Sequence, residues 1–124
     1  MSMRRRKGRR AHAFGTRAED AACAALAQDG WSVLGRRVRT EAGELDILGE
    51  KDGLLAVIEV KARPTLADAA AALSPRQQAR LLAAAEIVLA AHPGWGINGI
   101  RFDLMVVDGA GAVRRISDAF RVAS

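Results

Sequence analysis

The sequence predicts an α/β fold in which a helix, three strands, a second helix and two more strands follow one another. Three observations support this order. Residues 14–29 are rich in alanine and place apolar residues at helical spacing. Asp52 and Gly53 separate two aliphatic runs, as the turn of a two-residue β-hairpin does. Ser74 and Pro75 suit the N-cap and the first position of a helix.

The first helix is expected over residues 14–29. Its apolar stripe consists of small and aliphatic side chains, namely Ala18, Ala21, Ala22, Ala25 and Leu26. Gly30 follows the last turn and is expected to end the helix. Glu19 lies at the edge of the inward face, which makes it a candidate site residue. The alternative is an exposed glutamate in the first turn, favoured there by the helix dipole.

The remaining elements follow from aliphatic runs and from turn residues. Strands are expected over residues 31–39, 43–49, 54–61, 100–107 and 112–117. The second helix is expected from its cap at residue 74 to about residue 91, ending before Pro93. Residues 62–73 are expected to form a loop, because Pro64 interrupts them and small residues predominate.

The hairpin brings two acidic residues together. If Lys51 pairs with Leu54 across the turn, paired positions have numbers that sum to 105, so Asp46 faces Glu59. Lys61 shares the face of Glu59, because side chains alternate along a strand. Two carboxylates directly opposite each other repel unless something positive lies between them.

This pattern suits a hard divalent cation. Mg²⁺ or Mn²⁺ prefers oxygen ligands, keeps several waters and is often completed by substrate phosphates. Such an ion can activate a water for phosphodiester hydrolysis, and Lys61 could orient that water or stabilise the transition state. The alternative is a surface ion pair, in which Glu59 pairs with Lys61 or Arg63 and Asp46 is an exposed strand residue.

The charge balance favours a nucleic-acid partner. The 124 residues contain 19 lysines and arginines against 14 acids, a net charge of +5. Residues 1–12 are expected to form a disordered basic tail before a single domain over residues 13–120. The basic run of the tail consists of Arg4, Arg5, Arg6, Lys7, Arg9 and Arg10. Such a run often contacts phosphates without sequence preference, although a solubilising tail is the alternative.

Composition excludes several classes of protein. Half of the residues are hydrophobic, but none of the apolar runs is long enough to span a membrane. The basic N-terminus lacks a following apolar stretch, so a secretory signal is not predicted and a cytoplasmic location is expected. Cys23 is expected to be a small core residue rather than a nucleophile. His12 and His92 have no partner at metal-ligand spacing, which argues against zinc.

Four ordered motifs carry a family resemblance. They are Gly-Thr-Arg-Ala-Glu-Asp-Ala-Ala at 15–22, Gly-Glu-Leu-Asp-Ile-Leu at 43–48, Ile-Glu-Val-Lys-Ala-Arg at 58–63 and Arg-Phe-Asp-Leu at 101–104. The chain resembles the PD-(D/E)xK nuclease superfamily, and more narrowly the YraN-like bacterial family, a distant relative of archaeal Holliday junction resolvases. The resemblance extends from about residue 13 to residue 120.

The resemblance implies a restriction-endonuclease-like αβββαβ(β) core, with a central mixed sheet flanked by helices. It implies that Asp46, Glu59 and the Val60 carbonyl bind Mg²⁺ or Mn²⁺, that Lys61 acts on the attacking water, and that Glu19 supports the metal or its water. Where the family tends to carry a lysine on the second helix, this chain has Gln77. The candidate phosphate contacts near this site are Arg63, Arg76 and Arg80.

The predicted function is therefore hydrolysis of DNA phosphodiester bonds by a metal-dependent endonuclease, with branched or junction DNA as one candidate substrate. The main alternative is a nucleic-acid-binding module that keeps the nuclease fold without the activity. A small interaction protein with a basic docking tail is a third hypothesis. Related junction-cutting enzymes act as two-fold dimers, which makes a homodimer one candidate assembly.

Overall fold

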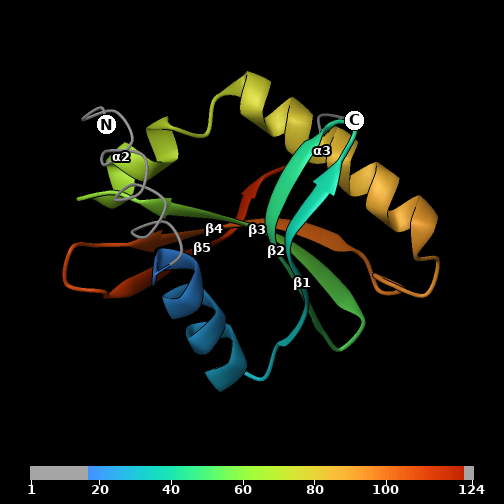
Figure 1. Ribbon diagram of the computed structural model, residues 1–124, viewed down its shortest axis with the longest axis horizontal. Helices are drawn as coiled ribbons and strands as arrows, with labels where there is room; N and C mark the ends of the chain where they lie inside the picture. Colours follow the sequence, from blue (N-terminus) through green and yellow to red (C-terminus); the bar gives the residue numbers. More distant parts are fainter. Residues whose placement is uncertain (1–16, 122–124) are drawn as a thin grey trace, which may run out of the picture.

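The computed structural model describes residues 17–121 and confirms an α/β fold with a mixed sheet (Figure 1). An N-terminal helix over residues 17–28 precedes the sheet. The other elements are β1 (Ser32–Thr40), β2 (Gly43–Lys51), β3 (Leu54–Ala62), α2 (Leu66–Ala71), α3 (Pro75–Ala91), β4 (Ile100–Val107) and β5 (Val113–Phe120). The five strands lie in the order β1-β2-β3-β4-β5, with β3 and β4 parallel and the other neighbours antiparallel.

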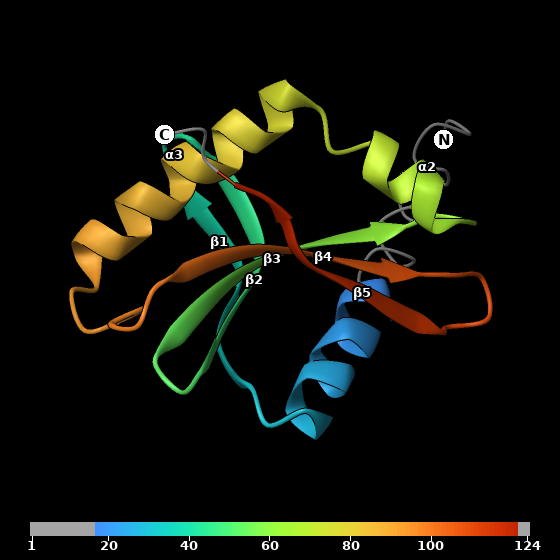
Figure 2. The same cartoon turned by 180° about the vertical axis from the view of Figure 1, so that it is seen from behind.

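The helices cover both faces of the sheet. Figure 2 shows α2 and α3 on one side and the N-terminal helix on the other. The parallel pairing of β3 and β4 requires a crossover connection, which α2 and α3 supply. Adjacent residues of β3 therefore enter different cores. Val57 packs against α3, whereas Ile58 packs against the N-terminal helix.

The N-terminal helix ends as its glycine predicts. Gly30 has a φ of 82°, a left-handed conformation that favours glycine. The Trp31 N–H donates to the Leu26 carbonyl at 3.0 Å and the Gly30 N–H to the Ala27 carbonyl at 3.1 Å. These two bonds form a Schellman motif, which satisfies carbonyls that the helix end would leave unpaired.

The predicted hairpin register is confirmed over five residue pairs. Asp52 and Gly53 have φ values of 53° and 79°, as a type I′ turn requires. Lys51 pairs with Leu54, and the ladder continues to the pair of Ile47 and Ile58. The register fixes which face each side chain occupies, because a shift of one residue would move every side chain to the other face.

Two elements differ most from those predicted. The expected loop at residues 62–73 contains α2, because the Thr65 hydroxyl caps the helix by accepting from the Asp68 N–H at 3.1 Å. The last strand continues beyond residue 117 to Phe120, whose ring stacks on Phe102 with centroids 4.6 Å apart. A register shift between Phe102 and Leu104 lets β5 continue through a sequence that resembles a turn.

The start of the second helix is as predicted. Ser74 caps α3 by accepting from the Gln77 N–H at 3.2 Å, and Pro75 occupies the first helical position. Within residues 17–121, no helix is long and apolar enough to cross a membrane.

Candidate functional site

The Asp46 carboxylate accepts a backbone hydrogen bond from β3 at the point where the β2–β3 ladder ends. The last paired residues are Ile47 and Ile58, and Asp46 occupies the next position. Its Oδ2 accepts from the Val60 N–H at 2.8 Å, replacing a backbone acceptor with a side-chain acceptor. This bond holds the Asp46 carboxylate against β3, beside Glu59.

Glu59 lies in the interior and is oriented from α3. It is 6% exposed, and its Oε2 accepts from the Gln77 Nε2 at 3.2 Å. The Gln77 Oε1 in turn accepts from the Arg80 guanidinium. Because the Ser74 cap fixes the first turn of α3, the side chains of Gln77 and Arg80 project toward the end of β3.

Neither acid of the pair forms an ion pair in the described part of the chain. Burial, and then the neighbouring Asp46 carboxyl, raise the pKa of Glu59 to about 9, although Lys61 and Gln77 act in the other direction. No ion pair within residues 17–121 includes Glu59, so the predicted alternative pairing with Lys61 or Arg63 does not form. Such a carboxyl pair favours the binding of a proton or a metal cation, which relieves the repulsion between the two carboxylates.

Lys61 lies two residues after Glu59 and shares its face of the sheet. It is half-buried, and it forms no ion pair with another residue of the described range. Lys61 therefore places an ammonium group close to the carboxyl pair, and no described carboxylate forms an ion pair with it. An ammonium in this position can stabilise negative charge on a phosphate.

Glu19 is buried, but the structure does not group it with the other two acids. The residue is 8% exposed, so the alternative of an exposed first-turn glutamate is wrong. Its Oε2 accepts from the Arg37 Nε at 2.7 Å and lies 3.8 Å from the Arg36 Nη2. Residues 17–121 contain no group of three or more acidic, histidine or cysteine side chains arranged to hold a metal. Glu19 is thus a partner of arginines on β1.

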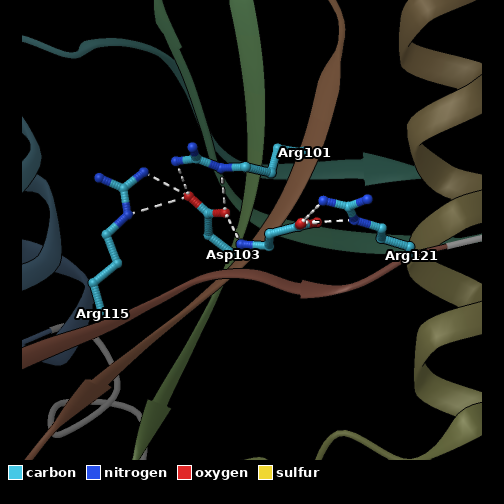
Figure 3. A network of polar contacts seen from close by, with 5 residues as sticks. Arg101, Asp103, Arg115 and Arg121 are labelled. Atoms are coloured by element: carbon cyan, nitrogen blue, oxygen red, sulfur yellow. Dashed lines mark hydrogen bonds and ion pairs between the residues drawn. The ribbon is translucent and has the colours of Figure 1, made fainter.

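A third buried acid, Asp103, is fully neutralised. Arg101 donates to both of its carboxylate oxygens at 2.8 Å, and the Arg115 Nε donates at 3.1 Å (Figure 3). The Asp118 N–H adds a bond of 2.9 Å. The two guanidinium groups lie 5.5 Å and 4.6 Å from the centroid of the Trp31 ring, which is itself buried. This network joins the strands and the N-terminal core.

Comparison with known proteins identifies the family. The profile of the Uncharacterised protein family UPF0102 matches residues 18–107. A UPF0102 protein of Granulibacter bethesdensis is 61% identical over 94% of this chain and 73% of its own length. Those of Azorhizobium caulinodans and Acidiphilium cryptum are 43% and 45% identical over 95% and 91% of this chain, covering 90% and 88% of their own lengths. The chain belongs to UPF0102.

The UPF0102 match confirms the resemblance to the YraN family. The matched segment includes all five candidate catalytic residues predicted from the sequence, namely Glu19, Asp46, Glu59, Lys61 and Gln77. It ends at Val107, before β5 begins. The sequence-based prediction of the centre therefore depended on the part of the chain that defines this family.

The donor set of this UPF0102 chain suits a hard cation. Asp46 and Glu59 offer carboxylate oxygens, and Val60 offers a backbone carbonyl on the same strand. Few protein ligands and only oxygen donors fit Mg²⁺ or Mn²⁺, which keep several waters, better than they fit zinc.

The described arginines predicted to contact phosphates are exposed, but they come from two separate segments of the chain. Arg76 and Arg80 are exposed at the start of α3, and Arg63 is exposed just after β3. The basic run from Arg4 to Arg10 lies outside the described residues. Sequence reasoning missed the arginines of β1 that pair with Glu19, because no local pattern links residues 17 or 18 positions apart. It also missed Arg114 on β5.

Proposed function

We propose that this UPF0102 protein is an endonuclease that hydrolyses DNA phosphodiester bonds with Mg²⁺ or Mn²⁺. The observation that supports it best is the carboxyl pair of half-buried Asp46 and buried Glu59, which forms no ion pair among residues 17–121 and has Lys61 on the same face. A carboxyl pair with a structural role alone would destabilise the fold with no ion pair to offset the loss, since buried charges are usually paired. Perturbed carboxyls of this kind are concentrated at functional sites.

Each side chain has a separate role in this proposal. Asp46, Glu59 and the Val60 carbonyl would hold the metal, which when bound supplies an activated water and polarises the phosphoryl oxygen. Lys61 lies beside the ligands and stabilises negative charge on the phosphate. Gln77 orients the Glu59 carboxylate through its amide. Glu19 is not among the ligands, because Arg37 already occupies its carboxylate.

DNA is the proposed substrate because the chain carries an excess of cations. Arg63, Arg76 and Arg80 are exposed near the centre, and the basic run of the tail would add contacts that do not depend on sequence. A non-catalytic binding module remains the second candidate function. Its supporting observation is that no third acidic ligand joins the pair within residues 17–121.

The test is cleavage of end-labelled duplex, flap, single-stranded and four-way DNA in Mg²⁺ and in Mn²⁺. We expect the wild type to cut at least one structure. Asp46→Asn should lose activity on the order of 10²-fold or more, because its amide oxygen can still accept from the Val60 N–H but cannot supply the charge. Arg39→Ala is the matched control, since this side chain is 90% exposed on β1.

The two candidate functions give different outcomes. If the wild type binds these DNAs but cuts none of them with either metal, the binding module replaces the nuclease. If Asp46→Asn cuts as fast as the wild type, the activity does not come from the carboxyl pair.

A further inference from the structure

Arg63 and Arg114 line a pocket near the carboxyl pair, beyond the end of β3. The pocket has a volume of about 290 Å³ and lies between the start of α2, the end of β4 and the start of β5. Arg63 and Arg114 contribute the cationic side chains, and Leu66 and Val106 contribute apolar walls. The pocket is distinct from the carboxyl pair, because neither Asp46 nor Glu59 lines it.

The sheet register places this pocket beside the centre. Lys61 of β3 is aligned with Val106 of β4, and Val106 is aligned with Arg114 of β5. Aligned residues on neighbouring strands share one face, so Lys61 and Arg114 lie on the face that carries Glu59. Neighbouring strands are about 4.8 Å apart, which puts the backbones of Lys61 and Arg114 roughly 10 Å apart.

The two arginines are available to an anion. Arg114 forms no ion pair with another residue of the described range, and the Arg63 Nη1 donates only to the Ala62 carbonyl, at 2.9 Å. Asp108 also lines the pocket, but its Oδ1 accepts from the N–H groups of Ala110 and Ala112, both at 2.9 Å. These bonds tie the Asp108 carboxylate into its turn.

Other arginines of the same sheet are engaged differently. Arg101 and Arg115 are bound to the buried Asp103, and Arg36 pairs with Asp20 at 2.7 Å. Arg114 is adjacent to Arg115 on β5 and points to the opposite face. The alternation of the strand thus assigns one arginine to an internal acid and leaves its neighbour directed at the pocket.

We propose that this pocket binds a backbone phosphate of the DNA. This phosphate is next to the one whose ester bond is cut, on the same strand. The proposal rests on the proposed function. A guanidinium group presents donors in a planar fork that matches phosphate, and the apolar walls suit a sugar. The bound strand would then run across the ends of β3 and β4 and the start of β5, away from the β1 edge of the sheet.

The experiment measures binding rather than cleavage. Fluorescein-labelled duplex and single-stranded DNA are titrated without divalent metal, over a range of salt concentrations, with the wild type and three variants. Arg114→Ala should bind duplex roughly threefold to tenfold more weakly, and its salt slope should fall by about 0.9, the value for one lost phosphate contact. Arg114→Lys should retain most of the affinity. Arg39→Ala removes the same charge at the other edge of the sheet and should change little.

The outcomes separate this proposal from the nuclease. Equal affinity and salt slope for Arg114→Ala and Arg39→Ala would overturn the phosphate site, even if the wild type cuts DNA. A wild type that binds neither DNA would also overturn it. A selective loss in Arg114→Ala, in a protein that cuts nothing, would support the site and reject the nuclease. Far-ultraviolet circular dichroism of each variant checks that the fold is retained.

Discussion

Glu59 and Asp103 are buried acids on neighbouring parallel strands, yet their surroundings differ completely. Asp103 is 2% exposed and receives hydrogen bonds from Arg101, Arg115 and the Asp118 N–H. Glu59 is 6% exposed and receives a bond from the neutral amide of Gln77. The two side chains also face different layers, because Glu59 aligns with Leu104 and Asp103 with Ile58.

The pKa values of the two acids move in opposite directions for this reason. Burial acts to raise the pKa of Asp103, but the bonds from Arg101, Asp118 and Arg115 outweigh it and lower the pKa below its usual value. At Glu59 the same burial is reinforced by the Asp46 carboxyl, and the pKa rises. Burial alone therefore does not set the direction in which the pKa of a buried acid moves; the presence or absence of a paired cation decides it.

The largest expected effect is on stability at the neutralised acid. Asp103→Asn should lower the free energy of unfolding by about 3–5 kcal/mol, because it leaves two arginines in a buried site without their counter-charge. Glu59→Gln should cost less than about 1 kcal/mol, since an amide resembles a carboxyl that is protonated at neutral pH. Urea unfolding without metal measures both. Equal losses would remove the contrast between the two acids.

Catalysis should depend on Lys61 and the pair of Asp46 and Glu59, and not on the hydrogen bonds around Asp103. Lys61→Ala should slow single-turnover DNA cleavage on the order of 10²-fold or more while leaving Mn²⁺ affinity nearly unchanged, because a cation cannot be a metal ligand. Lys61→Arg should not restore the full rate, since a planar fork does not place its charge where an ammonium does. Calorimetric titration of Mn²⁺ accompanies the kinetics. Cleavage by Lys61→Ala at the wild-type rate would remove this lysine from the mechanism.

A divalent cation should stabilise the folded chain at the carboxyl pair. At a Mn²⁺ concentration 100 times the dissociation constant, the gain is about 2.7 kcal/mol and the melting temperature rises. The rise should be larger at pH 8 than at pH 6, because binding requires the pair to lose its proton. Thermal melts of the wild type and of Asp46→Ala provide the measurement. An identical rise in the variant would place the metal elsewhere.

A dependence of stability on pH is also expected in the absence of metal. The pKa of Glu59 is about 9 in the folded chain and about 4.5 ordinarily. Its contribution is therefore complete below pH 4.5 and is lost as the pH rises toward 9, by roughly 1 kcal/mol per pH unit. Asp103 has the opposite sign, because its lowered pKa removes stability as the pH falls below about 3.8. Urea unfolding between pH 5 and 9 should show a shallower slope for Glu59→Gln than for the wild type.

Local signals were sufficient for most of the elements. Asp52 and Gly53 specified the turn type, and the turn fixed the register that brings Asp46 next to Glu59. Gly30 and Ser74 specified a helix end and a helix start, because the orphan groups of a helix are satisfied within a few residues. Thr65 and Asp68 carried the same kind of signal for α2, which alanine-rich sequence after Pro64 concealed.

The sequence by itself determined the two carboxylates, their facing strands and the lysine beside them, since periodicity and turn geometry act along the chain. Tertiary structure decided that Glu59 is buried under α3 with no ion-pair partner among residues 17–121, and that Glu19 is bound by Arg37. It also decided that Arg63 and Arg114 share one pocket. These features depend on which strands and helices pack together, and the packing sets the burial and neighbouring charges on which a pKa and a binding site depend.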